Sequence, residues 1–187
     1  MAVTVTSICN MALRQIGEKR ISDISDLTDP ARILTDVYEP VRNEVLESHP
    51  WNFSIIRVAL VVLAGTPAFG YTYQFQLPAD CLRVIRMSET DIEFKIEQDR
   101  LLTNESSAKI LYIKLVTDTS LYSATFVATL ATRLAAEIAY PITNDQTLAV
   151  NKYKEYLEML RVAKGVDAQG GGTTEKIEEN TWLTSRG

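Results

Sequence analysis

The single histidine, His49, carries the side chain best suited to act as an acid or a base near neutral pH. One histidine excludes sites that need a histidine pair. A Ser-His-Asp triad would also lack the usual Gly-x-Ser-x-Gly turn, which this sequence does not contain. His49 stands directly before Pro50, where a helical pattern of apolar residues ends. We therefore predict that His49 is a packed or hydrogen-bonded structural residue rather than a catalytic base.

The other candidate groups for chemistry also have simpler explanations. Asp23, Asp26 and Asp29 lie at three-residue spacing, whereas a calcium loop places oxygen ligands at every second position around a central glycine. Helix capping and turns explain these aspartates better. Cys9 and Cys81 occur in apolar patterns typical of buried thiols. The GTPAFG stretch at 65–70 lacks the Lys-Ser/Thr of a phosphate loop. The sequence therefore predicts no catalytic, cofactor-binding or metal-binding residue.

The composition fits an ordinary folded protein. Of 187 residues, 46% are hydrophobic and 23% are charged, enough for one domain or two small ones. A net charge of −5 argues against a protein that holds nucleic acid through a broad basic face. Two distant cysteines indicate a reducing compartment, and no signal peptide or long apolar span is apparent. By elimination we expect a soluble protein made in the cytoplasm, without a membrane partner.

Four helices are expected from apolar residues at helical spacing. The first covers about residues 7–16, is capped by Thr4 or Thr6, and stops at Gly17. The second begins with Asp29 as N-cap and runs from residue 30 to about 48, with a kink at Pro40. The third covers about 123–140 and is ended by Pro141, and the fourth runs from 144 or 145 to about 168.

Between the second and third helices the pattern changes to alternation, which indicates strands. We therefore predict an α+β fold: a bundle of about four helices, formed by residues 1–53 and 117–169, with a small antiparallel β domain at 54–116 inserted into it. Residues 170–187 follow as a flexible or extended C-terminal tail.

The point where helix gives way to strand contains four large or restrictive residues: His49, Pro50, Trp51 and Phe53. The residue before a proline is disfavoured in the helical region, so the helix should stop here. Trp51 and Phe53 at period two indicate extended chain leading into the first strand. Their rings could form an exposed anchor for a partner, but filling the corner between two domains is the preferred interpretation.

Several strings of the chain, in order, resemble the head-to-tail adaptor proteins of tailed bacteriophages, also called tail tubular protein A in short-tailed phages. They are ICNMALRQIGEKRISDISD, ILTDVYEPVRNEVLESHPWNFSI, FGYTYQFQLPADCLRVIRM and FVATLATRLAAEIAYPIT. The resemblance runs from about residue 6 to about residue 169. No single string is a chemical signature, and the specificity lies in their combination and order.

The resemblance implies a structural protein of the virion, not an enzyme, that needs no cofactor. Subunits would form a homo-oligomer, a dodecameric ring, between the portal protein and the tail nozzle or tube, and DNA would pass through the bore without sequence-specific contact. The alternative is a virion-associated enzyme that degrades the cell wall during entry. It would need two carboxylates in a cleft, and nothing in the sequence directs any two of Glu44, Glu47 and Glu137 to one point.

Two groups of residues are candidates for contacts within such an assembly. Glu89, Asp91, Glu93 and Glu97 either form a solvated strand face or line the bore, where like charge would keep DNA from sticking. The second group belongs to the tail, where apolar side chains occur among polar ones. It is either a recognition element that orders against the portal or a neighbouring subunit, or an end that is not used. Its members are Ile177, Trp182 and Leu183.

Overall fold

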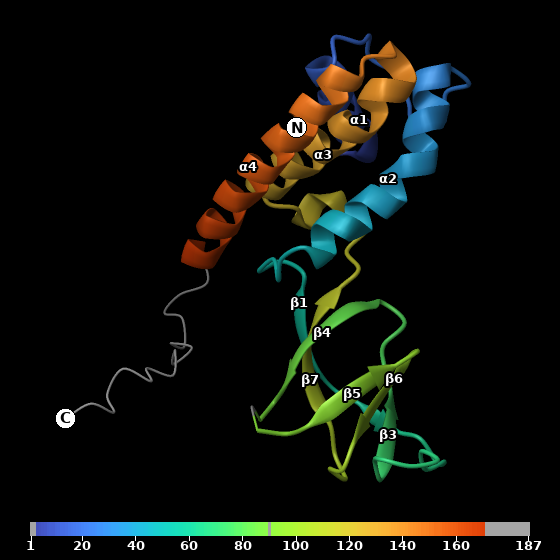
Figure 1. Cartoon of the computed structure of the whole chain (residues 1–187), viewed down its shortest axis with the longest axis vertical. Helices are drawn as coiled ribbons and strands as arrows, with labels where there is room; N and C mark the ends of the chain where they lie inside the picture. Colours follow the sequence, from blue (N-terminus) through green and yellow to red (C-terminus); the bar gives the residue numbers. More distant parts are fainter. Residues whose placement is uncertain (1–2, 90, 171–187) are drawn as a thin grey trace, which may run out of the picture.

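The structure, a computed structural model, describes residues 3–89 and 91–170 of the chain. It has an α+β fold in which four α-helices gather at one end of the molecule and antiparallel strands at the other (Figure 1). The predicted fold class, with strands between the second and third helices, is confirmed. The division into domains at residues 53/54 and 116/117 stays a prediction.

The helices begin and end close to where the sequence places them, with three corrections. Helix α1 (Val5–Gln15) starts at the predicted Thr4 cap, which forms a capping box with Ser7. Helix α2 (Asp29–Glu47) has Thr28 as its N-cap, not Asp29, and continues through Pro40. Helix α3 (Ala124–Thr143) includes Pro141 and ends at Asn144 in a left-handed conformation. Helix α4 (Gln146–Gly170) extends two residues beyond its predicted end at 168.

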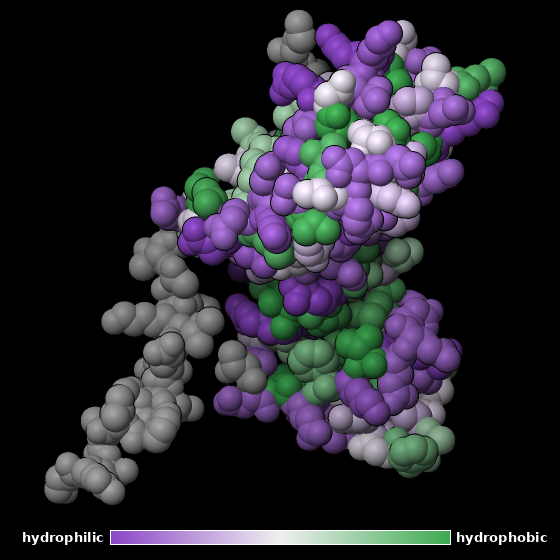
Figure 2. Space-filling view, turned by 45° about the horizontal axis from the view of Figure 1, so that its top comes forward, coloured by the Kyte–Doolittle hydropathy of each residue, from purple (hydrophilic) through white to green (hydrophobic). Residues whose placement is uncertain are grey.

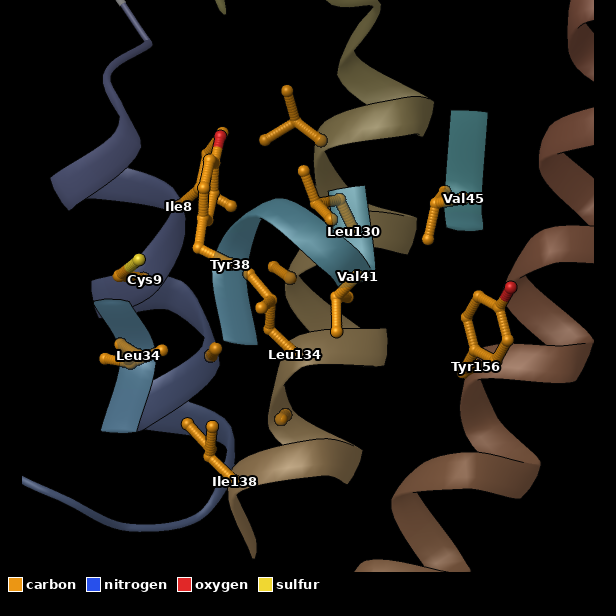
Figure 3. Packing of buried hydrophobic residues seen from close by; sticks show 14 of the residues in the cluster. Ile8, Cys9, Leu34, Tyr38, Val41, Val45, Leu130, Leu134, Ile138 and Tyr156 are labelled. Carbon is orange, nitrogen blue, oxygen red and sulfur yellow. The ribbon is translucent and has the colours of Figure 1, made fainter. Parts of the chain in front are cut away.

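Helix α3 forms the centre of the larger hydrophobic core, in contact with α1, α2 and α4. All the apolar residues predicted for its inner stripe are buried, and the alanines among them allow neighbouring helices to approach closely. Figure 3 shows Ile8 of α1, Val41 of α2 and Tyr156 of α4 arranged around Leu130 and Leu134 of α3. The amphipathic stripes of the sequence therefore account for this core.

Helix α4 packs less deeply than predicted. Its apolar pattern predicts an inner side made of Leu148, Tyr153, Tyr156, Leu157, Leu160 and either Ala163 or Lys164. Only Tyr156 and Ala163 are buried, whereas Tyr153 and Leu157 are about half exposed. Because α4 contacts the bundle mainly through α3, a wide apolar stripe on it finds only one neighbour to cover it.

The predicted β region consists of two sheets rather than one. The strands, in chain order, are β1 (Ile55–Ala59), β2 (Val61–Val62), β3 (Tyr73–Gln76), β4 (Cys81–Met87), β5 (Phe94–Glu97), β6 (Arg100–Thr103) and β7 (Lys109–Lys114). One sheet has the order β1-β7-β4 and the other β2-β3-β6-β5, with antiparallel neighbours in both. The chain passes from the first sheet to the second at Leu60, whose N–H donates to the carbonyl of Ala108.

A second, smaller core lies between these sheets and is built around Phe75, Met87, Leu101, Ile110 and Tyr112. Cys81, predicted to be buried, is only half-buried at its margin, whereas Cys9 is fully buried in the helical core. Strands β1 and β7 pair from Ile55↔Ile113 to Ala59↔Lys109. The two segments that connect the sheets to the helices therefore lie side by side.

Candidate interaction surfaces

The turn between α2 and β1, residues 49–54, combines packed aromatic rings with polar contacts, and we call it the junction turn. Trp51 is completely buried, and its Nε1–H donates to the carbonyl of Val45 at 2.9 Å. Its ring meets Phe126 edge-on at 5.1 Å. Phe53 is half-buried, with its ring 5.0 Å from Phe126 and 5.6 Å from that of Tyr122. The prediction that Trp51 and Phe53 fill the corner is confirmed.

The backbone of the junction turn differs from the prediction of extended chain. Trp51 N–H donates to the carbonyl of His49 at 2.9 Å, and Ser54 N–H to that of Trp51 at 2.8 Å. These bonds form tight turns, so β1 begins only at Ile55. The period-two spacing of Trp51 and Phe53 resembles a strand but reflects two rings that stack on one another, with centroids 6.3 Å apart.

His49 is hydrogen-bonded, and its partner is Asp167 near the end of α4. Its Nε2 lies 3.2 Å from Asp167 Oδ2, and the same carboxylate accepts the backbone N–H of Asn52 at 3.1 Å. The Asp167 side chain is only 8% exposed. Burial lowers the pKa of His49, against an opposing effect of the Asp167 carboxylate. At neutral pH a neutral imidazole thus donates its Nε2–H. The side-chain amide of Asn52 also donates to the backbone carbonyl of Asp167, so three groups fix α4 to the junction turn.

Asp167 did not stand out in the sequence, although one signal was present. A carboxylate in the last turn of a helix interacts unfavourably with the helix dipole, and α4 has no basic residue in that turn. An acid there suggests a partner elsewhere in the fold. The partner could not be identified locally, because His49 lies 118 residues away.

Two of the carboxylates considered for cell-wall chemistry do converge, which the sequence did not indicate. Glu44 Oε2 and Glu137 Oε2 lie 2.9 Å and 2.7 Å from the guanidinium of Arg133. That guanidinium also stacks over the rings of Tyr153 and Tyr156. Both carboxylates are therefore engaged by one cation, and this site links α2 to α3 instead of offering a free acid–base pair.

Asp26 and the two cysteines also lie in settings that explain them structurally. Asp26 Oδ2 accepts the backbone N–H groups of Ser22 and Asp23, as expected for a turn. In the described part of the chain, no three His, Cys, Asp or Glu side chains are grouped so that they could hold a metal ion. Burial raises the pKa of the Cys9 thiol to about 12 and that of Cys81 to about 11, so neither is a ready nucleophile.

The four acidic residues of the β region are all exposed, which both interpretations of them require. Glu97 pairs with Lys95 at 3.0 Å, and Glu93 accepts the hydroxyl of Tyr71 at 3.4 Å. The Lys95 pairing reduces the negative potential at Glu97. A role of Glu89, Asp91, Glu93 and Glu97 in lining a bore stays a prediction.

Among the described residues, exposed large apolar side chains occur at several sites, including β2, where Val61 is 72% exposed; two sites bear on association. Helix α4 carries Val150, Tyr153, Leu157, Met159, Val162 and Val166, and in the loop at 65–70 the side chain of Phe69 is 88% exposed. Part of the α4 set lines a groove of about 400 Å³ against α3, between Ala128 and Val162. On the face in view in Figure 2, hydrophobic residues also gather where the β region meets the helices. Such surfaces mark sites of association in a folded protein.

The tail residues Ile177, Trp182 and Leu183 lie outside the described residues, which end at Gly170 beside Asn52. Within the described ranges, no helix has both the length and the apolar character to cross a bilayer. No family model and no curated protein matches this chain.

Proposed function

We propose that the chain is a structural subunit of the head-to-tail adaptor of a tailed phage. Copies of it, about twelve, would close into a ring that joins the portal to the tail nozzle or tube in the virion and lets DNA pass through its bore. The observation that carries the proposal is the set of exposed apolar side chains along α4.

The arrangement of these side chains on α4 fits a ring. Val150, Tyr153 and Leu157 follow one line of the helix, and Val162 and Val166 follow another. The buried stripe of Tyr156 and Ala163 lies between the two lines. A closed ring needs two different surfaces on each subunit, because each copy contacts one neighbour with one surface and the next with the other. Two apolar flanks on a single helix supply such surfaces.

The two ends of the molecule fit two different partners. The loop at 65–70, with its exposed Phe69, lies at the end of the β region farthest from the helices (Figure 1), and with the loop at 88–91 it is the candidate for the tail side. The helices and the tail residues Ile177, Trp182 and Leu183 are candidates for the portal side. An exposed aromatic ring at a loop tip is the kind of anchor that dominates protein interfaces.

The proposal is tested by measuring the mass of the protein alone and after mixing with portal protein. We expect a single ring species on the portal. Leu157→Glu with Val162→Glu places one charge on each flank and should leave a folded monomer. The matched control is Thr147→Glu with Lys154→Gln, which makes the same net charge change at exposed positions between the two flanks and should assemble normally.

Two outcomes would contradict the proposal. One is a wild-type protein that never gains mass on the portal, and the other is normal assembly of the Leu157/Val162 variant. Release of soluble fragments from peptidoglycan by the purified protein would favour the cell-wall enzyme instead.

A further inference from the structure

The outer side of the three-stranded sheet carries four cations, which we call the basic face: Arg57 of β1, Arg83 and Arg86 of β4, and Lys109 of β7. Arg57 and Arg86 both lie opposite Leu111 in the register, and Arg83 lies opposite Ile113. Lys109 is two residues from Leu111, so it points to the same side. The four cations therefore project from one side of the sheet.

That side faces away from the β core. Val58, Val84, Met87, Ile110 and Tyr112, which alternate with the cations along the same strands, belong to the small core between the sheets. Arg57, Arg83 and Lys109 are exposed, and Arg86 is half-buried, donating to the carbonyls of Met87 at 3.2 Å and Ser88 at 3.4 Å. Around Leu111 the face is hollowed into a cavity of about 330 Å³, lined also by Val58 and Ala59. The basic face thus combines positive charge with an apolar floor.

These cations are unusual for an acidic chain of net charge −5. Like charges on neighbouring strands destabilise a sheet unless an anion lies among them. Across residues 3–89 and 91–170, no carboxylate forms an ion pair with Arg57, Arg83 or Lys109. An anionic partner with some apolar surface would satisfy both properties of the face.

The chain itself has a segment of this kind that begins close to the basic face. Residues 171–187 follow directly from Gly170, which lies beside Asn52, three residues before β1. They contain Glu175, Glu178 and Glu179, with Ile177 and Trp182 as apolar side chains. The eight residues from 171 to 178 reach up to ~27 Å, whereas the seven steps from Asn52 to Ala59, the last residue of β1, span at most ~23 Å. Glu178 and Glu179 can therefore reach the far end of the face at Lys109, and Glu175 can reach its near end.

We propose that residues 171–187 dock on the basic face of the same chain. Glu175, Glu178 and Glu179 pair with Arg57, Arg83 and Lys109, and Trp182 covers the apolar floor at Leu111. This inference does not depend on the adaptor proposal, since it concerns the free subunit. In an adaptor it would keep the segment away from other subunits until an assembly partner displaces it.

The direct test is zero-length carbodiimide cross-linking of the full-length protein, followed by peptide mass spectrometry. We expect a link from Lys109 to Glu175, Glu178 or Glu179, and none from these residues to Lys19, which is exposed at the helical end of the molecule. An equal mixture of ¹⁴N- and ¹⁵N-labelled protein shows whether the link forms within one chain or between two chains. Links within one isotope support the proposal, whereas mixed-isotope links or no link at all overturn it.

A second measurement uses trypsin cleavage after Lys176, which docking should slow. Arg57→Glu with Lys109→Glu should speed the cleavage by about tenfold, as 0.5 M salt should in the wild type. Lys19→Glu with Arg20→Glu carries the same charge change on the helical end and should leave the rate unchanged.

Duplex DNA is the other polyanion that four cations could attract. A gel shift that depends on Arg57 and Lys109, together with a cleavage rate after Lys176 that these residues do not affect, would overturn the proposal and assign the face to phosphate.

Discussion

The helical region and the β region of this molecule differ in how completely their apolar side chains are covered by neighbouring elements. In the helical region α3 is surrounded by its neighbours and Trp51 is inserted from the junction turn, so that the apolar stripes of three helices are covered. In the β region a small core holds two sheets together, while the outer side of one sheet carries cations and the loops carry exposed apolar residues. The helical region therefore holds the larger core, whereas surface for contacts is offered both by α4 and by the β region.

The strongest test of this contrast is Trp51→Ala. The substitution removes a fully buried ring and its hydrogen bond to Val45, and it should lower the free energy of unfolding by about 3–5 kcal/mol. Urea denaturation followed by far-ultraviolet circular dichroism measures the change. Trp51→Phe keeps most of the volume and should cost clearly less. An unchanged midpoint for the alanine variant would contradict the assignment of Trp51 to the core.

A smaller effect is expected from the β core. Leu101→Ala empties a fully buried position between the sheets and should cost about 3 kcal/mol, with loss of structure confined to the β region at first. Hydrogen exchange resolves the two regions, and the amides of β3, β6 and β7 should lose protection before those of α3. Ile96→Ala is the control, because Ile96 lies opposite Leu101 in the register yet is 39% exposed. Simultaneous loss of protection in both regions would instead show a single cooperative unit.

The smallest effect concerns pH and the junction turn. Burial lowers the pKa of His49 in the folded state, so the unfolded chain binds more protons at this residue. The contribution of His49 to stability is therefore complete above its ordinary pKa of about 6.5, and it is lost as the pH falls below that value and through the lower pKa of the folded state. Unfolding midpoints between pH 8 and pH 5 should fall less steeply for His49→Gln than for the wild type. A wild-type profile that is flat over this range would refute the expectation.

The sequence predicts features that repeat locally. In residues 33–45 and 126–139, apolar side chains recur every three or four positions. This spacing indicates the two helices and also which of their faces are buried. Pro141 was interpreted as a stop because it lacks an N–H and disfavours a continuing helix. The structure accommodates it in the last turn, where Thr143 Oγ1 donates to the carbonyl of Ala139 and Asn144 N–H to that of Tyr140. Pro141 therefore removes only the bond to the carbonyl of Glu137, while the turn that follows it keeps its own bonds.

Features that depend on pairing between distant segments could not be predicted in the same way. The pairing of β1 with β7 joins Ile55 to Ile113, and no local pattern encodes that register. Arg57, Arg83 and Lys109 are scattered in the sequence and become one surface only when three strands align. The same holds for His49 and Asp167, whose contact fixes the end of α4. Local periodicity thus identifies what is buried, whereas the candidate surfaces arise from topology.

The side-by-side course of β1 and β7 has a mechanical consequence. Both strands leave the helices at the same end of their ladder, where Ile55 pairs with Ile113. A pull between the helices and the far tip of the β region would run along both strands at once. The ladder bonds lie across that direction, so the load would stretch two covalent backbones in parallel and would not unzip the sheet. The β region is thus attached to the helices by two paired strands, β1 and β7, which transmit tension without breaking the hydrogen bonds between them.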